Sequence, residues 1–382
     1  MTRSSFDLAV VGGGIQGASV ALFAQRAGMK VVLLERDALA RGASGVNAGT
    51  LTMQMTRAAL IPYALKAHEM WLKAPEWLGH DVGVVACDGL SLAFTEAEEA
   101  LLEERGKARS AAGAPIKLIT ATEALKVEPG VNPNMRMASH CSIDGYANAY
   151  LTGLAYHRAL TEAGVEVREY SPVSGMEPAG KGYELRGAGA IVRARQVVLA
   201  GGVWIEPMLG WLGIHVPIKT LTNQLAVTER CRPVMRTVVG IASGLLSLKQ
   251  YPHGTVVIGG GWQGEGSREA NTHRSSYAST VGNARLATHA IPALRHSRLV
   301  RVWTGFEAET ADALPAVGPV PGFEGVWVSG SAHSGYTSAP YMAHCLTQAI
   351  LGGEPDMPLF PIDRLLPGTS YALKDKSAHD TL

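Results

Sequence analysis

Residues 7–35 read DLAVVGGGIQGASVALFAQRAGMKVVLLE, and this stretch decides how the start of the chain folds. Leu8–Val11 is a short apolar run of the kind that forms a buried strand, and Lys30–Leu34 is a second one. Between them, Ala18–Ala27 has the composition of a buried helix, which Gly28 ends. The stretch therefore predicts a strand–helix–strand unit with a glycine-rich turn after its first strand.

The glycines of this turn, Gly12, Gly14 and Gly17, have the spacing G-x-G-x-x-G. In that motif the first glycine permits a tight turn, the second lets the backbone approach a pyrophosphate, and the third lets helix and strand pack closely. The helix N-terminus directs free N–H groups at the phosphates. Glu35 ends the second strand, close to the spacing at which an acid binds ribose hydroxyls. The unit therefore predicts dinucleotide binding.

The composition is that of an ordinary globular protein. The chain has 382 residues, of which 47% are hydrophobic and 18% are charged, so one large or two medium domains with an ample core are expected. The formal net charge of +1 gives no electrostatic reason to expect nucleic acid or an acidic membrane surface as a partner. We find no apolar signal core and no apolar run of membrane-spanning length, so we expect a cytoplasmic protein without an integral membrane segment.

The cysteines lie far apart in the sequence and form no C-x-x-C pair. This spacing predicts neither an iron–sulfur cluster nor a zinc site, and no metal ion is expected. Reduced thiols in a cytoplasmic protein are the simpler interpretation. The four residues are Cys87, Cys141, Cys231 and Cys345.

Further along the chain, helical and extended patterns alternate. Helices are predicted at 56–78, 95–112, 121–127, 149–163, 275–290 and 335–351. Strands are predicted at 90–94, 165–168, 191–194, 196–200, 218–228, 246–250, 255–258, 299–303 and 325–329. The small-residue stretch 42–51 and the proline- and glycine-rich stretch 304–322 are predicted to be loops.

Four segments together resemble the D-amino-acid-oxidase-like superfamily of FAD-dependent oxidoreductases. This group includes glycine and sarcosine oxidases and the flavin subunits of proline, hydroxyproline and opine dehydrogenases. The segments, which span nearly the whole chain in family order, are VVGGGIQGASVALFAQRAGMKVVLLER (10–36), GASGVNAGTL (42–51), VVLAGGVW (197–204) and TADALPAVGPVPGFEGVWVSGSAHSGYTSAP (310–340).

The resemblance and the chain pattern together predict an α/β fold, α+β overall. A discontinuous Rossmann-like FAD-binding domain is expected from residues 1–83, 142–215 and 305–382. A second, substrate domain with a mixed or antiparallel sheet is expected from residues 84–141 and 216–304, roofing the flavin.

The resemblance implies FAD and a set of residues that contact it. Glu35 would hold the adenosine ribose, and Val173 would contact the adenine through its backbone. The loop around Ser44 would pass along the pyrophosphate and the isoalloxazine, and the helix that opens at Gly335 would point at the pyrimidine edge of the flavin. The full predicted set is Gly12, Gly14, Ile15, Gln16, Gly17, Glu35, Arg36, Ser44, Asn47, Ala48, Gly49, Leu51, Val173, Gly201, Trp204, Gly335, Tyr336 and Thr337.

Three residues are predicted on the substrate side. In amino-acid-oxidising relatives, an arginine that pairs with the substrate carboxylate stands where this chain has Glu307. A carboxylate repels another carboxylate, so either another residue binds the substrate acid or the substrate presents a cation or hydroxyl to Glu307. His333 falls where relatives place a substrate-side polar residue, and Tyr251 is a candidate pocket residue. Their plainer interpretations are a solvated loop acid, a hydrogen-bonding residue behind the site, and core packing.

The resemblance implies an enzyme that oxidises the C–N bond of an amino acid or secondary amine, imino-acid or opine-like, by hydride transfer to flavin N5. Oxidase and dehydrogenase activities both stay open, with O2, a quinone or a partner subunit as electron acceptor. The resemblance also leaves room for heteromeric partner subunits. The alternative is a non-catalytic or electron-relaying FAD subunit of a heteromeric dehydrogenase, which the missing arginine favours.

Overall fold

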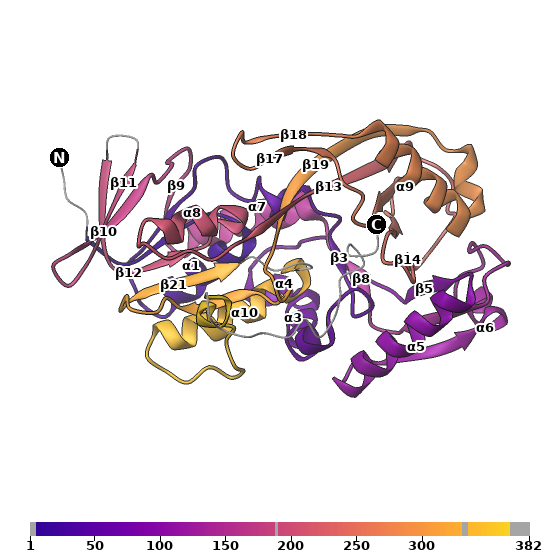
Figure 1. Cartoon of the computed structure of the whole chain (residues 1–382), viewed down its shortest axis with the longest axis horizontal. Helices are drawn as coiled ribbons and strands as arrows, with labels where there is room; N and C mark the ends of the chain where they lie inside the picture. Colours follow the sequence, from indigo (N-terminus) through magenta and orange to yellow (C-terminus); the bar gives the residue numbers. More distant parts are fainter. Residues whose placement is uncertain (1–4, 188–189, 331–334, 367–382) are drawn as a thin grey trace.

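The computed structural model describes residues 5–187, 190–330 and 335–366 of the chain. Its strands form two eight-stranded sheets, a three-stranded sheet and a two-stranded sheet. In Figure 1 the small sheet that contains β3 and β8 lies between the two large ones. The fold is of the mixed α/β class, α+β overall, as the sequence predicts.

The first large sheet carries the glycine-rich turn. Its central strands run parallel in the order β9-β2-β1-β12-β21, and β10, β11 and β20 add antiparallel partners. Alternate residues of β1 enter two different hydrophobic clusters, Leu8 and Val10 one of them and Ala9 and Val11 the other. Burial on both faces explains why the central strands are continuous apolar runs. The strands are β1 (Ser5–Val11), β2 (Val31–Leu34), β9 (Glu166–Arg168), β10 (Gly175–Ala179), β11 (Gly182–Gly187), β12 (Ala190–Leu199), β20 (Ala316–Pro319) and β21 (Val326–Gly330).

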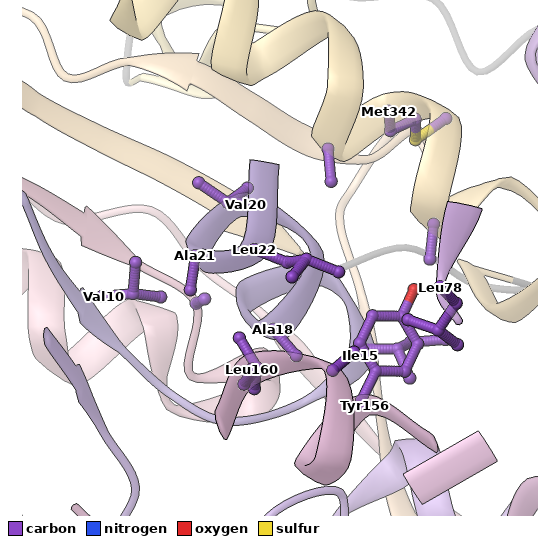
Figure 2. Close-up of a cluster of buried hydrophobic side chains, with 14 of the residues drawn as sticks. Val10, Ile15, Ala18, Val20, Ala21, Leu22, Leu78, Tyr156, Leu160 and Met342 are labelled. Atoms are coloured by element: carbon purple, nitrogen blue, oxygen red, sulfur yellow. The ribbon is translucent and has the colours of Figure 1, made fainter. Parts of the chain in front are cut away.

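Helix α1 (Ile15–Arg26) packs between α7 (Ala149–Glu162) and α10 (Gly335–Ile350). Figure 2 shows the contact, with Tyr156 of α7 and Met342 of α10 on either side of α1. The Tyr156 hydroxyl lies 2.6 Å from the Ser19 hydroxyl, so this buried phenol has a hydrogen-bond partner. Because both neighbouring helices present apolar side chains, α1 is buried nearly all round, which fixes its N-terminus against the sheet.

The second large sheet has the order β19-β13-β16-β15-β14-β5-β7-β6. Its pairs are antiparallel except for β5 with β14. Its strands are β5 (Gly89–Ala93), β6 (Ile116–Thr120), β7 (Met137–Cys141), β13 (Lys219–Thr228), β14 (Val238–Ile241), β15 (Ser247–Gln250), β16 (Val256–Gly259) and β19 (Leu299–Glu309). Three helices pack on it, α5 (Glu96–Ala111), α6 (Ala121–Val127) and α9 (Tyr277–Ala290). This mixed, mainly antiparallel sheet is the second sheet that the sequence predicts.

The three-stranded sheet joins the two large ones. It consists of β3 (Thr50–Leu51), β4 (Val85–Ala86) and β8 (Gly145–Tyr146), while β17 (Glu265–Ser267) and β18 (Thr272–Arg274) form a separate hairpin. The Thr50 hydroxyl lies 3.1 Å from that of Ser247 in β15, and the backbone carbonyl of Thr50 accepts a hydrogen bond of 3.2 Å from Thr337 in α10. Thr50 thus contacts the second large sheet through β15, and it contacts α10, which packs on the first large sheet.

The prediction of a loop over 304–322 is wrong in two places. β19 continues to Glu309, paired with β13 along its length, and β20 forms at Ala316–Pro319. The glycines and prolines suggested a loop, but Phe306 and Ala308 alternate with Glu307 and are buried, which is the pattern of a strand with one covered face. β19 also crosses the predicted domain boundary at 304/305, and the domain division itself stays a prediction.

Other boundaries also differ. The helix predicted over 56–78 is divided into a 3-10 turn (Ala58–Leu60), α3 (Ile61–Leu72) and α4 (Ala74–Trp77), because a proline occupies the first turn of α4 and starts a new helix. The two strands predicted at 191–200 are the single strand β12. The loop predicted over 42–51 contains the short helix α2 (Ala43–Val46) and β3.

Candidate functional site

A cavity of about 1030 Å³ begins at the glycine-rich turn and extends beneath β19 to α5. It is lined by 16 of the 18 residues predicted to contact FAD, which come from both ends and the middle of the chain. These are Gly12, Gly14, Ile15, Gln16, Glu35, Arg36, Ser44, Asn47, Ala48, Gly49, Val173, Gly201, Trp204, Gly335, Tyr336 and Thr337. Gly17 and Leu51 do not line the cavity; Leu51 is fully buried in the hydrophobic cluster around α1.

The three motif glycines have different surroundings. Gly12 has a φ of +116°, and a Cβ there would lie 2.4 Å from the Ala200 carbonyl oxygen. A Cβ at Gly17 would lie 2.1 Å from the Gly12 carbonyl oxygen, so Gly17 permits close packing of helix and turn. A Cβ at Gly14 would meet only the Ser44 hydroxyl, at 3.1 Å. Gly14 is therefore the glycine whose missing side chain leaves space in the cavity.

Glu35 stands at the carboxyl end of β2 with its carboxylate held by the backbone. It accepts hydrogen bonds from the N–H of Gly13 at 2.7 Å and from the N–H of Asp37 at 2.8 Å. Next to it, the Arg36 guanidinium lies over the Trp204 ring, 3.4 Å from the ring centre, and donates to the Asn271 side chain at 3.3 Å. Trp204 follows β12 and Asn271 belongs to the β17–β18 turn, so three separate segments meet at this end of the cavity.

The small-residue segment between α2 and β3 is shaped by its own hydrogen bonds. The Asn47 side chain donates to the Ser44 carbonyl at 2.6 Å and accepts from the Gly49 N–H at 2.6 Å. Gly49 has a φ of +71°, and a Cβ there would lie 2.1 Å from the Ala147 carbonyl oxygen. The hydroxyl of Ser44, in the preceding helix α2, accepts from the Ile15 N–H at 2.9 Å, so α2 also caps α1.

The start of α10 is held at the cavity by contacts with α3 and α7. The Tyr336 ring stacks on Trp71 of α3 with 4.9 Å between ring centres, and the Trp71 indole donates to the Thr337 carbonyl at 2.9 Å. The Tyr336 hydroxyl lies 2.7 Å from that of Thr152, and burial raises the pKa of Tyr336, so the phenol stays neutral. These contacts hold the N-terminus of α10, with its positive dipole end, against the cavity.

Replacing Trp71 with alanine is expected to destabilise the protein by about 3–5 kcal/mol, because a fully buried indole and its hydrogen bond are both lost. The thermal midpoint and the fraction of bound flavin should both fall. Trp71→Phe is the matched control, since it keeps an aromatic ring against Tyr336 and should lose only about 1 kcal/mol. An unchanged thermal midpoint for Trp71→Ala would contradict this assignment.

Of the three residues predicted on the substrate side, Glu307 lines the cavity. It lies half-buried on β19 and accepts a hydrogen bond from the Asn223 side chain of β13. Tyr251 is not among the lining residues; its hydroxyl donates to the Ala147 carbonyl at 3.3 Å, and its ring packs on Tyr146. Its predicted catalytic role stays a prediction that this placement does not support. His333 lies outside the described residues.

Several polar residues of the cavity were missed from the sequence. Arg105 and Arg109 of α5 line it, and each donates to a carbonyl, of Ala242 at 2.7 Å and of Thr56 at 2.8 Å respectively. They lie in a charged amphipathic helix, where an arginine is ordinarily expected in solvent. Asn223 was missed because only its register opposite β19 brings it to Glu307.

The residues of the cavity fit a bound FAD. The turn at Gly14 is open to the cavity, a carboxylate stands at the end of β2, and the N-termini of α1 and α10 border the cavity. Its volume is at the upper end of the roughly 300–1,000 Å³ of small-molecule sites, as expected for a cofactor and a substrate together. No group of three or more metal-ligating side chains is present, and no helix is long and apolar enough to cross a membrane, within the described residues.

Comparison with known proteins agrees with this fit. The sequence pattern of the family described as "DAO: FAD dependent oxidoreductase" matches residues 7–349. One subunit of the opine oxidase of Rhizobium meliloti is 30% identical over 379 residues, covering 94% of this chain and 97% of that protein. Glycine oxidase of Geobacillus kaustophilus (strain HTA426) is 26% identical over 332 residues, covering 85% and 87%.

Two solved structures share the fold. The crystal structure of glycine oxidase from Geobacillus kaustophilus gives a TM-score of 0.87 at 23% identity, covering 97% of this chain and 100% of that chain. That of L-proline dehydrogenase from P. horikoshii gives 0.84 at 22% identity, covering 94% and 96%. The family match spans both large sheets and every lining residue of the cavity. The chain therefore belongs to the DAO family of FAD-dependent oxidoreductases, and it is an enzyme that uses FAD.

Proposed function

We propose that this enzyme oxidises the C–N bond of an amino acid or secondary amine, with opine-like compounds as the preferred class. The observation that carries the proposal is the charge pattern of the cavity. Glu307 presents a carboxylate from β19, while Arg105 and Arg109 present guanidinium groups from α5. Opposite charges on the walls of one cavity suit a compound that has both an amine and a carboxylate.

In the proposed reaction a C–N single bond becomes C=N. The α-carbon loses hydride, the nitrogen loses a proton, and bound FAD supplies the hydride acceptor, its N5. Glu307 would face the cationic nitrogen before that proton leaves. The arginines would hold an acidic group distant from the reacting carbon, and the residues of the β3 segment would exclude water around it. The similarity to an opine oxidase supports an N-carboxyalkyl amino acid as the substrate class.

The electron acceptor is O2, a quinone or a partner subunit. The opine oxidase relatives of Rhizobium meliloti and Agrobacterium tumefaciens are each one subunit of an oxidase, which supports a second subunit for this protein too. The four cysteines are free thiols and are not clustered into a metal site within the described residues, so this chain offers no iron–sulfur relay there. Copurification from the native source, followed by reduction of the complex with substrate, tests whether electrons leave through a partner.

An anaerobic screen tests the reaction. The flavin-loaded protein is mixed with an N-carboxyalkyl amino acid, proline, sarcosine, glycine and a matched amine without a carboxylate, and the absorbance of bound flavin is followed. The N-carboxyalkyl amino acid is expected to bleach the flavin most rapidly. If no amine bleaches a flavin that dithionite still reduces, the alternative of an electron-relaying subunit without its own substrate gains support, and the proposal is wrong.

Arg105→Ala is expected to raise the half-saturating concentration of the N-carboxyalkyl amino acid about tenfold, because it removes one charge-assisted hydrogen bond to the second acid. Bleaching by sarcosine, which lacks that second acid, should change little. Arg301→Ala, an exposed arginine of β19, is the matched control for loss of one positive charge. An equal effect of Arg105→Ala on both substrates would assign Arg105 to structure and not to selectivity.

A further inference from the structure

A lysine is buried just behind the wall of the cavity, where β15 of the second large sheet meets β3 of the three-stranded sheet. Lys249 of β15 has no exposed surface, and its ammonium group donates to the Thr50 hydroxyl. Strand alternation puts Lys249 on the same face of β15 as Ser247, whose hydroxyl lies 3.1 Å from that of Thr50. Thr50 and Ser247 both line the cavity, so Lys249 lies one layer of hydroxyl groups behind its surface.

The direction of these hydrogen bonds follows from the lysine. A protonated lysine has donors and no acceptor, so Thr50 must accept from it. Thr50 and Ser247 then have two hydroxyl hydrogens between them, and their mutual hydrogen bond uses one. The other hydrogen is bonded to no other described residue, so it is available to a ligand in the cavity that both side chains line. A charged Lys249 therefore makes this part of the wall a hydrogen-bond donor, and a donor with a positive charge behind it binds an anion.

Burial and one thiol dominate the electrostatic surroundings of Lys249. Among the described residues, no carboxylate forms an ion pair with it. The titratable group nearest to it in effect is the thiol of Cys87, and burial raises the pKa of that thiol to about 11, so it is uncharged near pH 7. Burial lowers the pKa of Lys249 to about 7. Since no described carboxylate offsets the charge of protonated Lys249, an anion that enters the cavity would stabilise the charged form of this lysine.

The position of Thr50 and Ser247 in the cavity indicates which anion would bind to them. Thr50 directly follows Ala48 and Gly49, which line the cavity, and its carbonyl accepts from Thr337 at the start of α10. Both neighbours belong to the surface proposed to contact the flavin. A group bound by Thr50 and Ser247 would therefore lie beside the reacting carbon, whereas the proposed function assigns Arg105 and Arg109 to a more distant acid.

We propose that Lys249, acting through the hydroxyls of Thr50 and Ser247, forms the subsite that binds the substrate carboxylate nearest the reacting carbon. It takes over the task for which Glu307 is unsuited by its charge. Lys249 is a positioning residue here, because the hydroxyls touch the substrate. The inference rests on the proposed function, and it specifies an α-carboxylate in the substrate.

Ligand binding tests the subsite without turnover. The flavin-loaded wild-type protein is titrated with acetate and with acetamide, which has the same shape and no charge, while the flavin absorbance is followed. Lys249→Met is expected to raise the Kd for acetate about 10- to 100-fold and to leave that for acetamide unchanged. The variant should fold, because methionine fills the space without a buried charge. Lys117→Met, on the exposed face of β6 in the same sheet, is the matched control and should bind acetate as the wild type does.

A second variant keeps the proposal testable if Lys249→Met binds no flavin. Thr50→Val keeps the side-chain shape but removes the hydroxyl, and it should weaken acetate binding to a similar extent. In turnover, Lys249→Met should raise KM for a carboxylate-bearing amine by more than it lowers kcat, and should leave the matched amine without a carboxylate unaffected. A merely structural lysine would change both amines alike.

The proposal is overturned if acetate causes no saturable change in the wild-type flavin spectrum, or if its Kd changes less than twofold in both Lys249→Met and Thr50→Val. It is also overturned if acetate binding is unchanged while the flavin reduction potential falls, since Lys249 then serves the flavin. Failure of the proposed function is a separate result. In that case acetate binding still depends on Lys249, but no amine bleaches the flavin.

Discussion

Replacing Gly14 with leucine is expected to give a folded protein that binds no FAD. Gly14 has a φ of −67°, which any residue adopts, so the backbone does not require glycine there. A new Cβ would meet one protein atom, the Ser44 hydroxyl at 3.1 Å, and the rest of the leucine would extend into the cavity. The side chain would occupy the space that a pyrophosphate needs at the N-terminus of α1.

The measurement is the flavin absorbance per protein after purification, together with circular dichroism to confirm the fold. We expect flavin occupancy to fall at least tenfold. Gly210→Leu is the matched control, because Gly210 is an exposed helical glycine of α8 (Ile205–Gly210) with no atom within contact distance of a new Cβ. A folded Gly14→Leu protein with full flavin content would place the cofactor elsewhere and refute the assignment.

The start of the chain was predictable because its local pattern and its tertiary role agree. An apolar run such as Leu8–Val11 is typical of a strand in a parallel sheet that is covered on both faces, and β1 is such a strand. The spacing of the glycines after it is typical of a phosphate-binding turn. The same agreement holds for α5, where Thr95 and Glu98 form a capping box at the predicted start. Each of these signals comes from residues that lie only a few positions apart in the sequence.

The substrate half of the site could not be predicted in this way. Glu307 was located by its place in a family pattern, but its partner Asn223 lies in another strand, and only the register of β13 against β19 brings the two together. Lys249 lies in the short strand β15, whose sequence is SLKQ, and nothing local indicates that its ammonium group meets Thr50. These contacts depend on how strands far apart in the sequence lie against each other, and a single sequence does not show that arrangement.

The carboxylate of Glu307 is oriented by its surroundings. Asn223 donates to it from β13, and the Asn223 side-chain oxygen accepts in turn from Gln263 at 2.6 Å. The amide of Gln263 is itself held by the Gly261 carbonyl at 2.8 Å. This chain of hydrogen bonds fixes Asn223 with its N–H groups toward Glu307, so the carboxylate is kept at the cavity wall. A fixed carboxylate selects for a cationic or hydrogen-bond-donating part of the substrate.

Glu307→Gln is expected to raise KM for the true substrate at least tenfold while lowering kcat by a smaller factor. Glutamine keeps the shape and a hydrogen-bond acceptor but removes the charge that a substrate ammonium would pair with in the ground state and the transition state alike. Glu324→Gln, an exposed acid of the β20–β21 turn, is the matched control and should leave both constants unchanged. Steady-state kinetics with the best amine from the screen provide the measurement.

If glycine, sarcosine or proline were a good substrate and the Glu307→Gln protein turned it over unchanged, Glu307 would play no part in binding. Selection for the amine would then have to come from other groups in the cavity.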